Sequence, residues 1–247
     1  MNFDSLIIFT DGACTGNPGP GGWAAILVSP KGQIRELGGK ASETTNNRME
    51  LMGAIKALAA LKTPSTDQII LYTDSTYVIR GITQWIWGWR SRGWKNAEGK
   101  DISNRDLWED LSAQVQRLKP SKIEWKYVRG HTGVPGNERC DEIAVGFANG
   151  KWVDLYEGPL LHYGIAIHDL PEDQNLPEMR SSEKKAPPYS YLSLHGGVVM
   201  RHETWADCER RVKGQSQAKF KKAKSEQDER EILRSWGLNP DSTVILE

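Results

Sequence analysis

The sequence has few cysteines and no long apolar run. Its three cysteines, Cys14, Cys140 and Cys208, lie far apart and form no CxxC pair, which argues against a disulfide framework or a zinc site and fits a reducing compartment. The apolar run over residues 6–9 is too short for a signal peptide, and no stretch approaches the roughly 20 apolar residues of a membrane span. We therefore expect a cytoplasmic protein with no membrane partner.

The sequence also has no net charge, with 32 basic and 32 acidic residues, so the overall charge does not indicate a polyanionic partner. The charges are nevertheless unevenly placed, because residues 201–224 are rich in Lys and Arg whereas residues 151–185 carry an excess of Asp and Glu. This unevenness favours separate modules over one uniform surface.

The first 150 residues alternate between strand and helix patterns, and we interpret them as one domain. Five segments have the apolar pattern of strands: 6–9, 23–28, 33–38, 68–72 and 123–127. Four have the pattern of helices: 44–61, 76–90, 104–118 and 137–148, the last with Asn137 as its predicted N-cap. Three strands followed by alternating helices and strands predict an α/β fold with a mixed five-stranded sheet flanked by helices.

The remaining residues are predicted to form a linker and a small second domain. Residues 151–188 contain five prolines with acidic residues between them, which predicts a linker, although the stretch 160–167 is apolar enough to dock on a neighbour. Residues 189–247 predict a small α+β domain, with a hairpin that turns at residues 195–197. Two helices should follow, each opened by a capping box: Thr204 with Asp207, and Ser225 with Asp228.

Four acidic residues occupy places from which an α/β sheet can bring them together. Asp11 and Asp74 follow apolar strands, whereas Glu50 and Asp141 lie near the starts of helices. No cluster of Cys or His accompanies them, so ligation by oxygen alone favours Mg²⁺ or Mn²⁺ over Zn²⁺. Two such ions about 3.5–4 Å apart can activate a water and stabilise the leaving oxygen of a phosphodiester. The alternative, from spacing alone, is a set of solvated surface acids.

The residues around these acids resemble bacterial type I ribonuclease H over about residues 4–150. The resemblance is carried by five stretches: 10–22, 45–50, 72–75, 130–133 and 137–142. It implies the ribonuclease H-like fold and a hydrolase that uses two divalent ions to cut RNA paired to DNA, leaving 3′-hydroxyl and 5′-phosphate ends. It also implies that Asp11, Glu50, Asp74 and Asp141 hold the metals, and that His131 assists proton transfer or product departure.

The setting of His131 agrees with that role, because it lies between Gly130 and Gly133 and should be exposed and mobile. Histidine is also the side chain that changes charge near neutral pH. The alternative is an ordinary surface histidine.

The same resemblance implies contacts with an RNA/DNA hybrid. Asn17 matches a residue near the RNA strand, and Asn46 and Asn47 match residues that contact the minor groove, where 2′-hydroxyls distinguish RNA from DNA. Capping of the following helix is the alternative role of Asn46 and Asn47. Thr45 and Asn104 match residues that grip a DNA phosphate.

Two departures from the family pattern predict a weakened grip on the DNA strand. Glu43 stands near the phosphate pocket, where relatives often carry Arg. Residues 84–95 hold four Trp and three cations and resemble the family's basic protrusion, with Trp85 and the later Trp108 at DNA-channel positions. Gly88 and Ser91, however, stand where relatives often have more basic residues. The alternative for several of these Trp is packing in the core.

The C-terminal residues 189–237 resemble the small hybrid-binding domain that is usually attached to the N-terminus of eukaryotic and some bacterial type I ribonucleases H. By position, Trp205 and Phe220 would stack on DNA sugars, and Lys221 and Lys222 would hold phosphates. The alternative is that the two aromatic residues form the core of this unit and the lysines are simply solvated. If the domain binds, it compensates for the weakened protrusion.

Two other functions remain possible from the sequence. One is a binding protein that has the fold but has lost its active site, against which the intact set of four acids argues. The other is a nuclease of the same fold that acts on double-stranded RNA or on a junction, against which the match of Asn46 and Asn47 argues. We expect a monomer that binds RNA/DNA hybrid.

Overall fold

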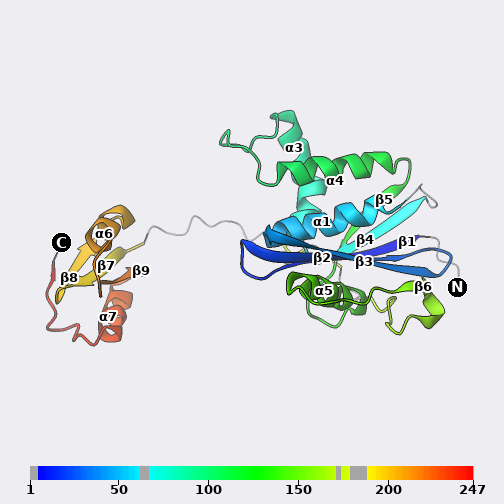
Figure 1. Cartoon of the computed structure of the whole chain (residues 1–247). Coiled ribbons are helices and arrows are strands. Elements are labelled where there is room, and N and C mark those ends of the chain that lie inside the picture. Colours follow the sequence, from blue (N-terminus) through cyan, green and yellow to red (C-terminus); the bar gives the residue numbers. More distant parts are fainter. Residues whose placement is uncertain (1–4, 62–66, 171–173, 179–187, 247) are drawn as a thin grey trace. The chain divides into compact units, whose positions relative to one another are not determined.

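The computed structural model describes residues 5–61, 67–170, 174–178 and 188–246. The chain divides into two compact units, Met1–Pro177 and Glu178–Glu247 (Figure 1). None of the helices in the described ranges is both long and apolar enough to cross a membrane.

The first unit is built on a mixed sheet of six strands in the order β5-β4-β1-β2-β3-β6. Strands β1, β2, β3 and β6 pair antiparallel, whereas β4 and β5 run parallel to β1. The bounds are β1 (Leu6–Cys14), β2 (Gly19–Val28), β3 (Gln33–Thr44), β4 (Gln68–Thr73), β5 (Lys122–Tyr127) and β6 (Glu157–Pro159). The mixed α/β sheet is confirmed, and it gains a sixth strand, β6, from the segment expected to be linker.

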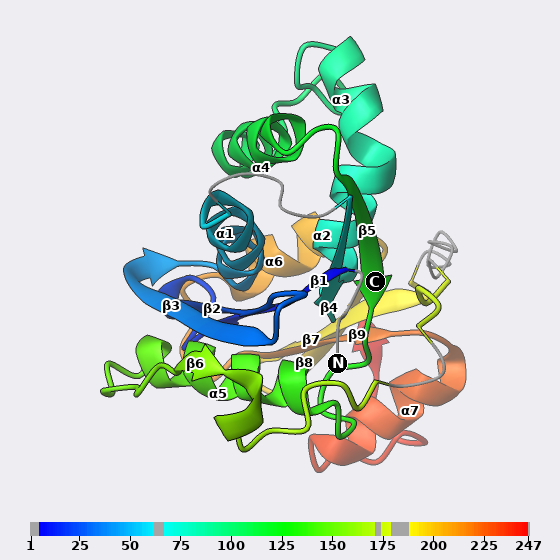
Figure 2. The same ribbon diagram turned by 90° about the vertical axis from the view of Figure 1, so that its right-hand side faces the viewer.

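Helices cover both faces of this sheet, as Figures 1 and 2 show: α1 and α4 lie on one side and α5 on the other. The elements are α1 (Asn46–Ala59), α2 (Thr76–Arg80), a π-helical turn η1 (Gly81–Trp85), α3 (Ile86–Ser91), α4 (Arg105–Arg117), α5 (Pro135–Ala148) and a 3₁₀ turn η2 (Leu160–His162). One apolar core lies between the sheet and α1 and α4, and the other lies between the sheet and α5.

Two expectations about helices need correction. The single helix expected over 76–90 is interrupted by η1, where the ring of Trp108 packs on Gly81 in the space that a side chain would fill. Residue Asn137 is not an N-cap, because α5 starts two residues earlier at Pro135 with Val134 as the capping residue. Proline suits the first helical position because its φ is already helical and it has no N–H to satisfy.

The expected linker 151–188 is also corrected, because residues 151–177 belong to the first unit. Strand β6 extends the sheet at β3, and Ile167 is only 1% exposed within the core beneath α5, so the docking expected for 160–167 is confirmed. The prolines and acidic residues give this segment the composition of a linker. Its docking could not be seen in the sequence, because an irregular segment has no apolar periodicity.

The second unit is a four-stranded sheet in the order β10-β8-β7-β9 with two helices. Its elements are β7 (Ser190–His195), β8 (Val198–His202), α6 (Trp205–Val212), β9 (Lys219–Ala223), α7 (Glu226–Ser235) and β10 (Ile245–Leu246). The expected hairpin is confirmed, with Gly196 and Gly197 in the left-handed region at φ 58° and 77°, as a two-residue hairpin turn requires. Thr204 and Ser225 are confirmed as N-caps, because their side chains accept from the backbone amides of Asp207 and Asp228, which is one half of each predicted capping box.

Candidate active site

The register of the sheet brings two of the predicted acids level with each other. In the parallel pair β1–β4, Phe9 lies opposite Tyr72, so Asp11 and Asp74, each two residues further along, emerge side by side. Asp74 follows the last residue of β4, whereas β1 continues past Asp11 to Cys14 in its pairing with β2. We had expected Asp11 to follow the end of its strand. It lies inside the strand instead.

A close approach of α1 to β1 brings in the third acid. A side chain on Gly12 would overlap the backbone of Met49 and Glu50, so only glycine lets the first turns of α1 lie against the strand here. Carboxylate oxygens of Asp11, Glu50 and Asp74 consequently lie within 4.8 Å of one another.

The fourth acid and the histidine stand beside this cluster. Asp141 in α5 is half-buried, and its charge adds a smaller increase to the rise that burial causes in the pKa values of Asp11, Glu50 and Asp74. The Nδ1 atom of His131 lies 4.0 Å from Oδ2 of Asp141, and the His131 side chain is 79% exposed. The residue has a positive φ of 54°, in the loop that follows β5. Its expected exposure is confirmed.

The three clustered acids are strongly disfavoured as free anions. Burial raises the pKa of Asp11 to about 8, and the neighbouring charge of Asp74 adds to the effect. Burial likewise raises the pKa of Glu50 well above its usual range, with Asp11 as the next cause, and burial raises the pKa of Asp74. A divalent cation would remove this repulsion, and all the available ligands are oxygens, which suits Mg²⁺ or Mn²⁺.

One oxygen has no other partner and is free to bind such a cation. Among the described residues, Oε2 of Glu50 is buried without a hydrogen bond. The other oxygen, Oε1, accepts from Nδ2 of Asn46 at 3.3 Å, so the carboxylate is held on one side only. The donor set and this orphaned oxygen fit a divalent metal site formed by Asp11, Glu50 and Asp74, with Asp141 beside it.

A residue that the sequence did not assign to the site also contacts it. Asn137 is 2% exposed, and its side chain donates a hydrogen bond to Asp74. Its interpretation as a helix cap concealed this contact, because only the docking of α5 against the sheet shows which side chain it meets.

The ribonuclease H family model matches residues 4–149 of the chain. The chain belongs to the ribonuclease H family. This family consists of nucleases that hydrolyse phosphodiesters, so the chain is a nuclease, and the acidic cluster is the place where such an enzyme would hold its metal.

Individual relatives support the same assignment over the first unit. The chain is 50% identical over 155 residues to "Ribonuclease H" of Cyanothece sp. (strain PCC 7425 / ATCC 29141), which covers 63% of this chain and 96% of the relative. It is 56% identical over 141 residues to "Ribonuclease H" of Pseudomonas paraeruginosa (strain DSM 24068 / PA7), covering 57% of this chain and 91% of the relative. A similar solved structure is LC9-RNase H1, described as a type 1 RNase H with the type 2 active-site motif. Its TM-score is 0.54 at 32% identity, over 62% of this chain and 77% of that one.

The asparagines expected to read the hybrid gather at the start of α1 in this ribonuclease H. Asn46 and Asn47 are its first two residues and are exposed. The side-chain oxygen of Asn17, from the loop between β1 and β2, accepts from the backbone amide of Asn46 at 3.3 Å. Capping of α1 is therefore done by Asn17, and the side chain of Asn47 is left to solvent.

The expected phosphate pocket contains a cation that the sequence did not reveal. Thr45 is the N-cap residue of α1, and Asn104 is the N-cap residue of α4. Between the two helices, Nη1 of Arg48 donates to Oδ1 of Asn104 at 3.4 Å, while Asp106 pairs with the same guanidinium at 2.6 Å. Asn104 also donates to the hydroxyl of Tyr77 at 3.2 Å. Arg48 thus joins the side chains at the starts of α1 and α4, with its charge paired to Asp106.

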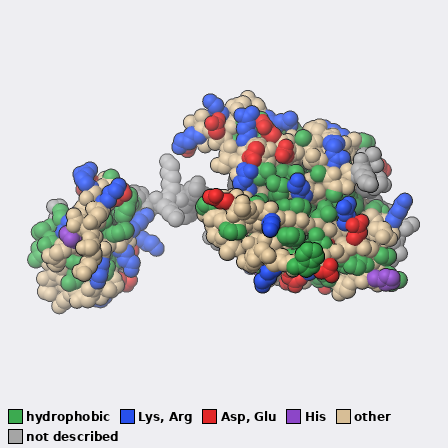
Figure 3. All heavy atoms as spheres, viewed as in Figure 1, with side chains coloured by type: hydrophobic (Ala, Val, Ile, Leu, Met, Phe, Trp, Pro, Cys, Tyr) green, Lys and Arg blue, Asp and Glu red, His purple; other side chains and the backbone are tan. Residues whose placement is uncertain are grey.

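The expected DNA contact of Trp108 is corrected, because its side chain is fully buried. The apolar face of α4 packs this ring into the core, where Nε1 donates to the hydroxyl of Tyr77 at 3.1 Å. Trp108 therefore supports Tyr77, which in turn holds Asn104. Trp85 is half-buried and packs against Tyr77. On the face that Figure 3 shows, Lys and Arg side chains over α3 and the following loop are interspersed with Asp and Glu, in line with the weak protrusion we expected.

The second unit exposes aromatic rings instead of burying them. Its core consists of other residues: Leu192, Val199, Ala223, Ile232 and Leu233. Trp205 is 40% exposed and Phe220 is 51% exposed, with ring centroids 5.3 Å apart. Tyr191, which the sequence did not single out, joins them at 5.8 Å from Trp205. The three rings form an exposed aromatic surface, defined here as Tyr191, Trp205 and Phe220.

Proposed function

We propose that the enzyme hydrolyses the RNA strand of RNA/DNA hybrids at its acidic cluster. The observation that carries the proposal is the convergence of Asp11, Glu50 and Asp74, in a chain of the ribonuclease H family, on a point that needs a cation. Mg²⁺ is the proposed ion, with Mn²⁺ as a substitute, and two ions are proposed per site with substrate bound. The exposed Asn46 and Asn47 support recognition of the RNA strand by its 2′-hydroxyls.

The proposed reaction leaves a 5′-phosphate and a 3′-hydroxyl. A water oxygen bonds to the phosphorus, the bond from phosphorus to the 3′ oxygen breaks, and that oxygen takes up a proton. When bound, the divalent ions would activate the water and stabilise the departing oxygen. The exposed imidazole of His131 is placed next to Asp141 and to solvent, so it can pass the released proton to solvent. One chain carries the whole acidic set, which supports action as a monomer, and the unpaired cysteines suit a reducing cytoplasm.

The first prediction tests the reaction and its rivals together. Labelled RNA/DNA, RNA/RNA and DNA/DNA duplexes are incubated with Mg²⁺ or EDTA, and the products are resolved on a gel. We expect Mg²⁺-dependent cleavage of the RNA strand of the hybrid only. The new 5′ ends should carry a phosphate that a phosphatase removes. Binding without cleavage would favour a hybrid-binding protein, and cleavage of RNA/RNA would favour a nuclease for another duplex.

We also propose that the second unit binds the hybrid through its aromatic surface. Exposed rings with adjacent lysines suit stacking on sugars and contact with phosphates. Lys222 pairs with Tyr191 across the β7–β9 ladder, whereas Lys221 pairs with Leu192 of the core. Because side chains alternate between the faces of a strand, Lys222 lies on the side of the aromatic surface and Lys221 points to the opposite side. This geometry supports Lys222, ahead of Lys221, as the main phosphate contact.

The second prediction concerns the loss of this unit. Deleting residues 178–247 leaves the first unit whole, so kcat should change by less than about twofold. The KM for hybrid should rise at least tenfold, because tethering a second binding unit multiplies apparent affinity by roughly 10²–10⁴ when both can engage. Steady-state cleavage at several salt concentrations measures both constants. An unchanged KM across the salt series contradicts the proposal.

Single substitutions refine the same test in the full chain. In a background of Asp11→Asn, which prevents cleavage, Lys222→Ala should weaken hybrid binding and reduce the salt dependence by about one phosphate contact. Lys221→Ala is the matched control and should have the smaller effect. Equal losses for the two lysines would contradict the assignment drawn from the strand register.

A further inference from the structure

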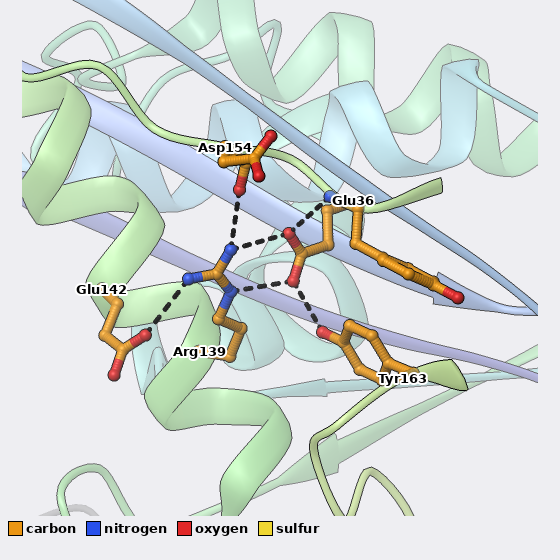
Figure 4. A network of polar contacts seen from close by, with 6 residues as sticks. Glu36, Arg139, Glu142, Asp154 and Tyr163 are labelled. Carbon is orange, nitrogen blue, oxygen red and sulfur yellow. Dashed lines mark hydrogen bonds and ion pairs between the residues drawn. The ribbon is translucent and has the colours of Figure 1, made fainter. Parts of the chain in front are cut away.

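A buried carboxylate outside the acidic cluster joins residues 151–170 to the sheet and to α5. The side chain of Glu36 in β3 has no exposed area, and it accepts four hydrogen bonds (Figure 4). Two come from Nε and Nη2 of Arg139, at 2.8 and 2.9 Å. The others come from the hydroxyl of Tyr163 at 2.6 Å and the backbone amide of Tyr156 at 2.9 Å. Burial opposes ionisation, yet the hydrogen bonds from Arg139 and Tyr163 hold the pKa of Glu36 below its usual value.

The segment that supplies Tyr156 and Tyr163 lies beyond the family match, which ends at residue 149. We call residues 151–170 the strap. Its strand β6 pairs with the edge strand β3, and its Ile167 is buried in the core beneath α5. Further along, Gln174 hydrogen-bonds the hydroxyl of Tyr72 in β4, and the carbonyl of Pro177 accepts from Arg80 of α2. The strap is therefore held to β3 and to the core beneath α5, and residues 174–177 beyond it are held to β4 and α2.

The partner of Glu36 stands on the helix that completes the active site. Arg139 lies in α5 between Asn137, which donates to Asp74, and Asp141, the fourth acid. Its Nη2 also donates to the carbonyl of Asp154 in the strap at 2.9 Å, and its Nη1 donates to Glu142 at 3.3 Å. The strap thus fixes Arg139 directly through Asp154 and indirectly through Glu36.

We propose that the strap is a positioning element of the active site, in which Tyr163 and Glu36 act through Arg139 to hold α5, and with it Asp141, in place for metal binding. This rests on the proposed role of Asp141 at the metal site. A helix is rigid over two residues, so a shift of Arg139 moves Asp141 and Asn137 together. Without the strap, Glu36 keeps two of its four donors and becomes a poorly solvated buried anion.

The strap contains its own matched control. The hydroxyl of Tyr163 contacts Glu36, whereas the hydroxyl of Tyr156 donates to the carbonyl of Pro159 at 2.7 Å and does not touch Glu36. Tyr163→Phe and Tyr156→Phe therefore remove the same atom from the same segment, and only the first should disturb α5.

For every variant of the full chain, the test measures two Mg²⁺ curves, hybrid cleavage well below the unfolding temperature and the rise in unfolding temperature without substrate. We expect Tyr163→Phe to raise the half-saturating Mg²⁺ concentration by about fivefold, less than the roughly 10–100-fold that follows the loss of a direct partner of a metal ligand, because Tyr163 acts through Glu36 and Arg139. Tyr156→Phe should stay within about twofold of the parent. If Tyr163→Phe only lowers the unfolding temperature and leaves both Mg²⁺ curves unchanged, the strap is a stabilising extension and the proposal is wrong.

A double-substitution cycle shows whether the effect passes through Asp141. Once Asp141 is replaced by Asn, the further change Tyr163→Phe should shift the Mg²⁺ curve by less than about twofold, since coupled residues are not additive. Full additivity would overturn the route through Asp141. An unchanged Mg²⁺ curve for Asp141→Asn alone would overturn the proposed role of Asp141 as a metal ligand, and the inference about the strap with it. A shifted curve for Asp141→Asn with an unchanged curve for Tyr163→Phe would overturn only the inference about the strap.

Discussion

Asp11→Asn is expected to reduce hybrid cleavage by at least about a thousandfold while making the metal-free protein more stable. The loss of cleavage follows from removing one of the three clustered ligands of a required cation, an effect of the size seen when groups that act as a unit are removed. The gain in stability follows from removing a buried charge that repels Glu50 and Asp74. Function and stability therefore oppose each other at this residue.

The stability gain should depend on pH with a definite sign. Asp11 has a pKa of about 8 in the folded protein against an ordinary value of 3.8, so between these values the folded state binds more protons than the unfolded state. The contribution of Asp11 to the free energy of unfolding of the metal-free parent consequently falls as pH rises from about 4 to about 8. Asparagine does not titrate, so the advantage of Asp11→Asn should grow over this window and level off above it, reaching about 1–4 kcal/mol.

Urea unfolding in EDTA at pH 5, 7 and 9 measures this difference, and Asp110→Asn is the control, since Asp110 is an exposed acid of α4. Adding Mg²⁺ should stabilise the parent much more than the variant, because a ligand stabilises only the state that binds it. A variant less stable than the parent at pH 9 in EDTA would contradict the account of the cluster, as would Mg²⁺-dependent cleavage that survives the substitution.

The acids and the strands that carry them could be predicted because the information is local. Asp11 and Asp74 each follow a short apolar run, and the parallel pairing of two such runs is enough to place their ends together. The N-caps Thr204 and Ser225 are local in the same way. Such features depend on a few neighbouring residues, so they can be predicted without knowing the tertiary contacts of the chain.

Contacts between distant segments could not be predicted. Asn137 looked like a cap because its preference for that position is real, but Pro135 starts the helix and turns Asn137 toward Asp74. Trp108 looked like a surface residue by position, but the apolar face of α4 buries it. The strap had the composition of a linker, and contacts with distant parts of the chain, such as the sheet edge at β3 and the carboxylate of Glu36, make it part of the fold.

A small change beside Asp74 should separate metal binding from folding. A side chain on Gly130 would overlap Oδ2 of Asp74, and Gly130 does not have a positive φ, so Gly130→Ala adds no backbone strain of its own. The far end of Asp74 can move aside at little cost to the fold, but it then leaves the position where its oxygen meets those of Asp11 and Glu50. We expect the half-saturating Mg²⁺ concentration for cleavage to rise by roughly 10–100-fold.

The measurement pairs a Mg²⁺ titration of hybrid cleavage with thermal unfolding in EDTA. The unfolding temperature should stay within a few degrees of the parent, since displacing one carboxylate from a repulsive cluster removes no packing. Gly164→Ala is the control, because an added side chain there meets no atom within 4 Å. If Gly130→Ala has the same Mg²⁺ curve as the parent, the metal does not bind the Asp74 carboxylate at its present position. A large loss of stability with an unchanged curve would instead make Gly130 a residue needed only for folding.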